Sequence, residues 1–417
     1  MALHHKYPVG DYTVFFSDKE EFTKYGYFDV NGSKTFSKYE AWQIAQQQGI
    51  PTDDIKFIFS DDKLSQVDWT VEPTASLQEL YAQRAQQIRD KYDYVVLMYS
   101  GGIDSHVILN TFLKNNIKLD EIVTIGNREY QPENAKINQE VFGKAIPYID
   151  LLNLDKLGTK FNYVDIGQLI IDQFSDQYHF DNFMYYYNGP LSPWYLAFRS
   201  QLFKLMNKGH VAEAESGKKV CYIWGYDKPN IFEVDGNWCF KYTDSVSDFS
   251  VRPYNNKERL GGVLSNFYDE PFFVTPDLPE LTIKQCHLLV KMLKTITTPN
   301  DPRLSPVEDI ANTGPFIEHP IGRGTISGRW LKKKELERIV YPDEDVDLFG
   351  DDKVRGSVMF TARDRWFFQS TFENRNKLIR KYKKMLREEA GYFKYNIEGV
   401  ALNSISLYGK PYIIDKS

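Results

Sequence analysis

Six residues at positions 100–105, Ser-Gly-Gly-Ile-Asp-Ser, combine residue types that can hold a phosphate group. They follow an apolar run at 94–99, typical of a buried strand, and precede a helical apolar pattern at 105–116. Adjacent glycines let consecutive backbone N–H groups point into one concavity, and a helix N-terminus adds unpaired N–H groups and a positive dipole end. The hydroxyls of Ser100 and Ser105 can donate further hydrogen bonds. The segment therefore predicts an anion site where a strand passes into a helix.

Asp104 is the member of this segment that carries the most specific information. A carboxylate beside phosphates repels them unless a cation lies between the two. Mg²⁺ commonly binds one or two carboxylates together with phosphate oxygens, so Asp104 is a candidate magnesium ligand. The alternative is a tight strand-to-helix turn in which Asp104 or Ser105 caps the helix. The complete six-residue pattern in this position favours the phosphate site.

Two common phosphate loops do not fit the segment. The P-loop requires a lysine after its glycines, and none follows Gly102. The dinucleotide fingerprint G-x-G-x-x-G requires a third glycine, whereas Gly101 and Gly102 are followed by none in the helix. The sequence therefore points away from NAD chemistry and from Walker-type nucleotide hydrolysis.

The segment resembles the S-G-G-x-D-S signature of the PP-loop ATP pyrophosphatases of the N-type. The resemblance is closest to the synthetase domain of asparagine synthetase. There too a helix corresponding to residues 76–93 precedes the loop, and a later strand ends in a turn similar to "WGYDKP" at 224–229. The resemblance covers roughly residues 75–235. It implies an adenine nucleotide alpha hydrolase-like fold, with ATP and Mg²⁺ as cofactors.

This resemblance implies a two-step reaction. An oxygen of a carboxylate or carbonyl attacks the α-phosphate of ATP and releases pyrophosphate, and an amine or ammonia then displaces AMP. The implied partners are a small-molecule acceptor and an amine or ammonia donor. The implied product is an amide or an amine.

The resemblance also implies roles for individual residues. The β- and γ-phosphates would be bound by the residues of the loop: Ser100, Gly101, Gly102, Ile103, Asp104 and Ser105. Adenine would lie at the end of the second strand, near Thr124, Ile125 and Gly126.

In the later turn, Gly225 would line the nucleotide site, and Lys228 would neutralise phosphate charge as a catalytic residue beside Asp104. The alternative for Lys228 is a surface lysine in a strand-end loop. Asp227 would be a second magnesium ligand, or the start of a turn before Pro229.

Two departures from the relatives bear on the nucleophile. Glutamine-dependent asparagine synthetases carry a cysteine directly after the initiator Met, whereas this chain has Ala2, and residues 1–70 contain no cysteine. We therefore expect free ammonia, ammonia delivered by a partner, or another amine. Cys221, Cys239 and Cys286 lie among apolar or aromatic residues and are expected in the core, which disfavours sulfur transfer.

Around the loop, strand patterns at 94–99, 121–126, 161–167 and 219–225 alternate with helical ones. Nearly unbroken apolar strands in such an alternation predict an α/β fold, with a parallel twisted sheet covered by helices on both faces. We expect three regions: a small α+β unit at 1–70, the ATP pyrophosphatase domain at 71–250, and a mainly helical region at 251–417 that contacts substrate or partner.

Composition sets broader limits on the protein. The 417 residues are 42% hydrophobic and 26% charged, as in ordinary globular proteins, and the net charge of −6 gives no general drive toward nucleic acid. The chain has neither a signal-peptide pattern nor a membrane-length apolar run, and its cysteines are widely spaced. We expect a cytoplasmic protein without a membrane segment, and a homo-oligomer is compatible with the sequence.

Two weaker features favour other interpretations. The acidic segment "YPDEDVDLFGDD" lacks the glycine and the final glutamate of an EF-hand and is expected to be a solvated loop. The basic segment "NRNKLIRKYKKMLREE" is typical of a solvated helix face, but it keeps open the same adenylation chemistry on a nucleobase of tRNA or DNA. A non-catalytic nucleotide-binding module is the third alternative.

Overall fold

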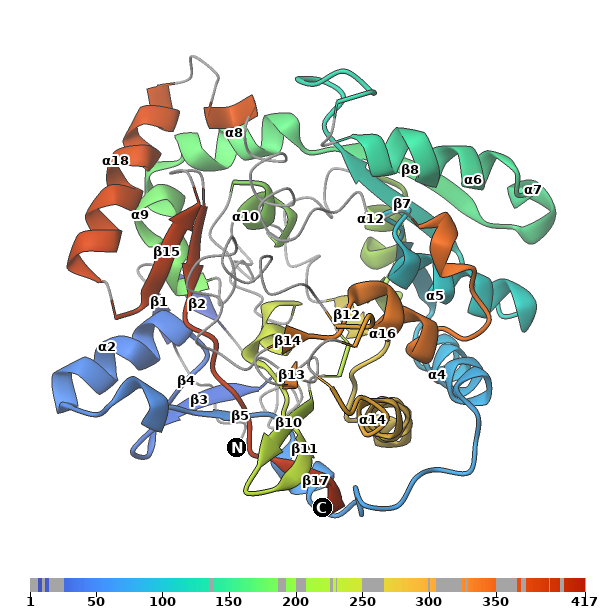
Figure 1. Cartoon of the computed structure of the whole chain (residues 1–417). Coiled ribbons are helices and arrows are strands. Elements are labelled where there is room, and N and C mark those ends of the chain that lie inside the picture. The colour runs from blue at the N-terminus through green and yellow to red at the C-terminus, as the bar shows by residue number, and fades with distance from the viewer. Residues whose placement is uncertain are drawn as a thin grey trace.

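The computed structural model describes residues 26–135, 138–186, 193–199, 208–225, 228–229, 231–249, 266–298, 301–304, 325–326, 329–349, 366–368, 373–389, 391–397 and 401–416, together with two short paired strands, β1 (Tyr7–Val9) and β2 (Tyr12–Val14). Its centre is a five-stranded parallel sheet connected by helices (Figure 1). The strands in chain order are β6 (Tyr94–Met98), β7 (Glu121–Gly126), β8 (Lys160–Asp165), β9 (Val220–Trp224) and β12 (Phe267–Pro271). The predicted α/β class is confirmed.

The strand order in this sheet is β12-β9-β6-β7-β8, and every neighbouring pair is parallel. The chain runs outward from β6 through β7 to β8, and then returns to place β9 on the other side of β6. All five residues of both β6 and β9 are buried, which explains their unbroken apolar sequences. In such sheets ligands bind outside the carboxyl ends of the strands, where the order reverses. Here that point lies between β6 and β9.

The helices before and after β6 have clear local causes. α4 (Leu77–Lys91) begins with a capping box, in which Ser76 Oγ accepts from Glu79 N at 3.2 Å and Glu79 Oε2 accepts from Ser76 N at 2.7 Å. α5 (Ile103–Lys114) follows β6 after a turn of four residues and packs against α4. These two helices therefore flank the strand that carries the predicted phosphate loop.

The later connections are longer. The link between β7 and β8 contains a π-helical turn, η2 (Val141–Ala145), and two short helices, α6 (Ile146–Asp150) and α7 (Leu154–Leu157). Between β8 and β9 the described helices are α8 (Gly167–Ser175), α9 (Gln177–Tyr186), α10 (Pro193–Arg199) and α12 (Lys208–Glu215).

The N-terminal residues described from 26 onward form a small α+β arrangement. Its antiparallel sheet has the order β4-β3-β5, made by β3 (Tyr27–Val30), β4 (Ser33–Thr35) and β5 (Lys56–Ile58). Between β4 and β5 lie α2 (Lys38–Gln48) and the 3-10 turn η1 (Thr52–Asp54), and the short helix α3 (Asp61–Leu64) follows β5. α2 ends at Gly49 in the left-handed conformation, which glycine adopts readily.

Beyond residue 250 the described chain is less helical than expected. It does contain α14 (Pro279–Leu293), α16 (Lys333–Val340), the 3-10 turn η6 (Val346–Leu348) and α18 (Glu373–Glu388). It also contributes β12 to the central sheet, and it forms the strand pairs β13 (Thr325–Ile326) with β14 (Arg329–Trp330) and β15 (Phe393–Ile397) with β16 (Ala401–Ser404). The apolar character of β12 is interrupted by Asp269 and Glu270, which hid the strand from the sequence pattern.

A second, antiparallel sheet pairs residues 412–416 with a hairpin at residues 231–240. β17 (Tyr412–Lys416) pairs with β11 (Asn237–Phe240), which forms a hairpin with β10 (Ile231–Val234). A further 3-10 stretch, η3 (Asp244–Phe249), follows this hairpin. In the part of the chain that the structure describes, no helix is both long enough and apolar enough to cross a bilayer.

A buried ion pair joins α4 to the last strand of the central sheet. The Arg84 guanidinium lies 2.9 Å from Glu270 Oε2 and also donates to the carbonyl of Pro271 at 2.9 Å. Glu270 is fully buried and takes further hydrogen bonds from Tyr92 and from Lys91 Nζ, the latter at 3.0 Å. The expected boundary at residue 250 therefore does not separate α4 from the chain beyond it.

We expect Glu270→Ala to lower the free energy of unfolding by about 3–5 kcal/mol, because it leaves Arg84 as an uncompensated buried charge. Urea denaturation followed by circular dichroism measures this. Lys91→Ala is the matched control, since it removes a half-exposed partner of the same carboxylate and should cost about 1 kcal/mol or less. Equal losses in the two variants would contradict the importance of the Arg84 pair.

Candidate functional site

The predicted phosphate loop lies between β6 and α5, at the carboxyl end of the central strand. Gly102 is the N-cap of α5 and provides no side-chain cap, while Ser105 Oγ donates to the Gly102 carbonyl at 3.0 Å. Gly102 N donates to Ser100 Oγ at 3.2 Å, which folds the loop back on itself. Ser100 is exposed at this edge. The loop thus places two hydroxyls beside the N-terminus of a twelve-residue helix.

Two glycines allow other backbone segments to approach this loop closely. Gly101 has a φ of +79°, and a Cβ there would lie 2.7 Å from the carbonyl oxygen of Glu140. A Cβ on Gly225, which follows β9, would lie 2.9 Å from the backbone nitrogen of Ser105. The turn after β9 therefore packs directly on the first turn of α5, and a larger residue at either glycine would push the segments apart.

Asp104 and Lys228 are brought into contact across the point where the strand order reverses. Lys228 Nζ lies 2.5 Å from Asp104 Oδ1, although the two residues are 124 positions apart. The Asp104 side chain is 32% exposed and that of Lys228 only 9%. The alternative interpretation of Lys228 as a surface lysine is wrong, since its ammonium group is buried against the loop. Asp227 lies outside the described residues.

A segment from beyond residue 330 completes this cluster. The Tyr341 hydroxyl donates to Asp104 Oδ1 at 2.6 Å, and Lys228 Nζ lies 5.5 Å from the centre of the Tyr341 ring. Glu337 Oε1, on α16, is 3.7 Å from Lys228 Nζ and 3.1 Å from Lys333 Nζ. Two carboxylates and two ammonium groups therefore alternate in this cluster, with a tyrosine hydroxyl beside them.

The charges in this cluster shift the ionisation of its members. Burial by itself would raise the pKa of Asp104, but the Lys228 ammonium and the hydrogen bonds from Lys228 and Tyr341 outweigh it and hold the pKa below its usual value. Burial and the adjacent Asp104 carboxylate raise the pKa of Tyr341 well above its usual value. At neutral pH the carboxylate is therefore ionised and the phenol retains its proton.

The residues expected near adenine lie at the end of β7. Thr124 is fully buried and donates from Oγ1 to the Tyr99 carbonyl at 2.9 Å, so its side chain supports the strand before the loop. Ile125 is half-buried. Gly126 is covered by an aromatic ring, because a Cβ there would lie 2.6 Å from the Tyr163 hydroxyl. These three residues share the sheet edge with the loop, one strand away from it.

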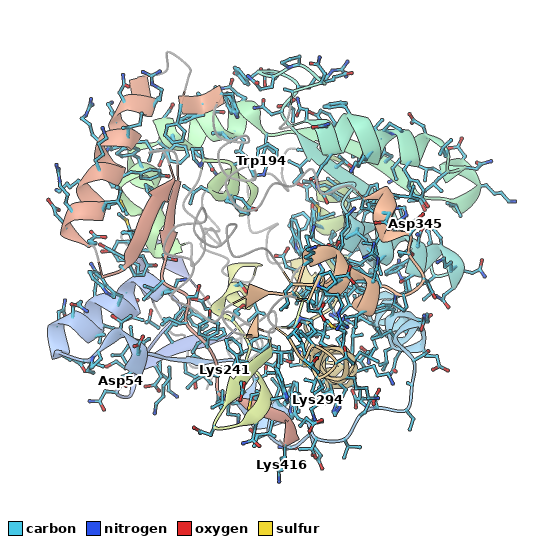
Figure 2. The ribbon with its side chains drawn as sticks, in the orientation of Figure 1. Asp54, Trp194, Lys241, Lys294, Asp345 and Lys416 are labelled. Carbon is cyan, nitrogen blue, oxygen red and sulfur yellow. The ribbon has the colours of Figure 1, made fainter. Side chains whose placement is uncertain are left out.

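Sequence reasoning missed the contribution of the segment from α16 to residue 349. Tyr341 and Glu337 are ordinary residues of an amphipathic helix and its end, and no local signal distinguishes them. The expectation of a solvated acidic loop after them is wrong at Glu344, whose side chain is 11% exposed and lies 3.8 Å from His106 Nε2 on α5. Asn110, also on α5, donates to Glu344 Oε2 at 3.0 Å. Asp345, labelled in Figure 2, belongs to this same segment.

The other acidic residues of this segment have separate partners. Asp343 accepts from Gln78 Nε2 at 2.9 Å, and Asp347 Oδ1 lies 3.0 Å from Arg338. Among the residues that the structure describes, no three His, Cys, Asp or Glu side chains gather as a metal site. A cation at the loop would therefore need oxygen ligands from a bound molecule as well as from Asp104.

The three cysteines lie where the sequence predicts. Cys221, Cys239 and Cys286 are all buried free thiols. Burial raises the pKa of Cys286 well above its usual value and also raises that of Cys239. Neither of these two thiols is placed as a reactive thiolate.

Comparison with known proteins finds no matching protein-family model and no curated protein of similar sequence.

We expect Gly101→Ala to lower the free energy of unfolding by at least about 1–2 kcal/mol, the cost of a left-handed backbone in a residue with a Cβ. The clash with the Glu140 carbonyl adds to this cost. Gly143→Ala is the control, because a Cβ there would meet no atom within 4 Å. Chemical denaturation of both variants measures the difference. A Gly101 variant as stable as the Gly143 variant would contradict the tight packing of the loop.

Proposed function

We propose that the protein is an ATP pyrophosphatase-type ligase of the PP-loop group, similar to asparagine synthetase in its synthetase chemistry. It adenylates a carboxylate or carbonyl oxygen of a small molecule, and an amine or ammonia then displaces AMP. The observation that supports this most is the contact of Asp104 with Lys228 where the strand order reverses. The parallel sheet with the loop after its first strand supports an adenine nucleotide alpha hydrolase-like fold.

In the proposed site the loop binds the leaving group. The backbone N–H groups at the start of α5 and the exposed hydroxyl of Ser100 would bind the β- and γ-phosphates, which a helix N-terminus favours. The buried hydroxyl of Ser105 donates to the Gly102 carbonyl and would hold the loop in shape. Asp104 suits a magnesium ion, because its carboxylate is ionised and partly exposed beside these donors. Magnesium held by Asp104, with Asp227 as a candidate second ligand, would neutralise charge on the departing pyrophosphate.

Lys228 would stabilise the charge that develops as the bonds change. The acceptor oxygen forms a bond to the α-phosphorus while the bond from that phosphorus to the bridging oxygen breaks, and pyrophosphate leaves. The ammonium group of Lys228 is held beside the loop by Asp104 and Glu337, so it needs little reorganisation to meet the phosphates. In the second step the amine attacks the activated carbon, AMP leaves with the bonding electrons, and the amine loses a proton.

In this proposal residues 1–70 do not produce the attacking amine by hydrolysing glutamine. With no cysteine among residues 1–70, the N-terminal unit lacks the nucleophile that hydrolyses glutamine in the relatives. Free ammonia, ammonia from a separate partner, or another amine fills this role.

We expect Asp104→Ala to abolish AMP formation and Lys228→Gln to lower kcat by about 10²–10³, the loss typical of one electrostatic stabiliser. Release of AMP and pyrophosphate, measured over a panel of carboxylate and amide acceptors with ammonium, provides the readout. Lys114→Gln is the control, since this lysine is 57% exposed on the far part of α5. Formation of ADP and phosphate in place of AMP and pyrophosphate would contradict the proposal.

The second candidate function is the same adenylation on a nucleobase of RNA or DNA. It is favoured by α18, whose buried face contains Leu378, Tyr382 and Met385. The opposite face exposes four cations at helical spacing: Arg380, Lys383, Lys384 and Arg387. Within the described chain only one of them is in an ion pair, Lys384 with Glu388 at 3.7 Å. A stripe of this kind fits a phosphate backbone.

If this second function holds, binding to a single-stranded oligonucleotide should weaken with salt. For four neutralised phosphates we expect a slope of log K against log salt of roughly −3. Replacing the four exposed cations of α18 by Gln should remove most of this slope in a fluorescence anisotropy titration. The matched control carries Gln at four exposed lysines elsewhere: Lys56, Lys63, Lys118 and Lys156. No salt-dependent binding by the wild type would exclude this function.

A further inference from the structure

The carboxylate of Asp104 is held by two donors on the same oxygen. Lys228 Nζ and the Tyr341 hydroxyl both contact Oδ1, at 2.5 and 2.6 Å. Among the described residues Oδ2 takes no hydrogen bond. Two donors on one oxygen restrain the carboxylate, whose terminal torsion otherwise has a broad minimum. One oxygen is thus occupied by the protein while the other is left for a ligand.

The position of the Tyr341 hydroxyl is itself set by three helices. Tyr341 directly follows α16, and its backbone N–H donates to the Glu337 carbonyl at 2.8 Å. The preceding carbonyl, that of Val340, accepts from the Tyr81 hydroxyl of α4 at 2.5 Å, and Tyr81 in turn accepts from Gln285 Nε2 of α14 at 3.0 Å. The Tyr341 ring is buried and lies 5.3 Å from the ring of Phe273.

The helices α4, α14 and α16 lie close together. α14 packs against both α4 and α16, and the three lie beside one another in Figure 1. These contacts restrain the position of the Tyr341 hydroxyl. A restrained, uncharged donor can orient the Asp104 carboxylate, in addition to the charge compensation that Lys228 provides.

We propose that Tyr341 is a positioning residue for Asp104: together with Lys228 it holds Oδ1, so that Oδ2 is the oxygen that meets the magnesium–nucleotide complex. The inference rests on the proposed function and extends the site to a residue 237 positions from the loop. Lys228 contributes a positive charge beside Asp104, whereas the neutral Tyr341 hydroxyl contributes only a directed hydrogen bond. Loss of the Tyr341 hydroxyl should therefore weaken nucleotide binding in the presence of Mg²⁺ and leave binding in its absence nearly unchanged.

Isothermal titration with α,β-methylene ATP, which cannot be cleaved at the α–β position, tests this without turnover. For Tyr341→Phe we expect the Kd measured with Mg²⁺ to rise about tenfold, as for the loss of one hydrogen bond to a charged group. The Kd measured in EDTA should change less than about twofold, because no cation then depends on Oδ2. Melting temperatures of each variant confirm that the fold is retained.

Tyr92→Phe is the matched control. It also removes one buried phenol hydroxyl that donates to a buried carboxylate, but that carboxylate is Glu270 and not Asp104. We expect it to lower the melting temperature while leaving the gain in affinity from Mg²⁺ unchanged. An equal loss of that gain in Tyr92→Phe, or none in Tyr341→Phe, would overturn the positioning role. A wild type that binds the analogue neither with nor without Mg²⁺ would overturn the proposed function instead.

Discussion

The ion pair between Asp104 and Lys228 constrains the arrangement of everything around it. The Lys228 side chain is almost fully buried, and a buried ammonium group is tolerated only where carboxylates compensate it. Asp104 lies in the first turn of α5 and Glu337 in α16, so the compensation requires three distant parts of the chain to meet. Removing both carboxylates would leave the buried Lys228 ammonium group without a compensating charge from them.

The rest of the fold supplies the rigidity that this pair needs. Gly101 and Gly225 let backbone segments approach the loop at distances that a side chain would prevent. The buried Arg84–Glu270 ion pair joins α4 to β12. The helix α14 packs against both α4 and α16. The cluster therefore lies on packed helices and strand ends, which hold side chains more exactly in place than long loops do.

The same arrangement supports the proposal that a large anion binds at this site. The loop has the N-terminus of α5 and the exposed hydroxyl of Ser100, and the Lys228 side chain lies beside it. A single ionised carboxylate among these donors would repel phosphates unless a cation joined them, which is why Asp104 gives the site its chemical character. Basic and acidic side chains alternate along the series Lys333, Glu337, Lys228 and Asp104, so the cluster has two residues of each sign.

The amino-acid sequence by itself determined the local features. The buried strand 94–98, the glycine turn after it, the capping box of α4 and the left-handed end of α2 follow from side-chain type and spacing over a few residues. Lys228 was predicted only from a short resemblance, and its position 2.5 Å from Asp104 Oδ1 came from the structure. β12 was not predicted, because two buried acids interrupt its apolar pattern and their partners, Arg84 and Trp224, lie in other elements.

Only the tertiary structure decided that α16 and Tyr341 belong to the site. Helical periodicity shows which face of α16 is buried, but it does not show which partner covers that face. The choice of partner depends on how α14 and α16 pack around α4, whose Tyr81 lies 204 positions from Gln285 and 259 positions from Val340. Packing of this kind is decided by the shape and charge of whole elements, and no short stretch of sequence contains it.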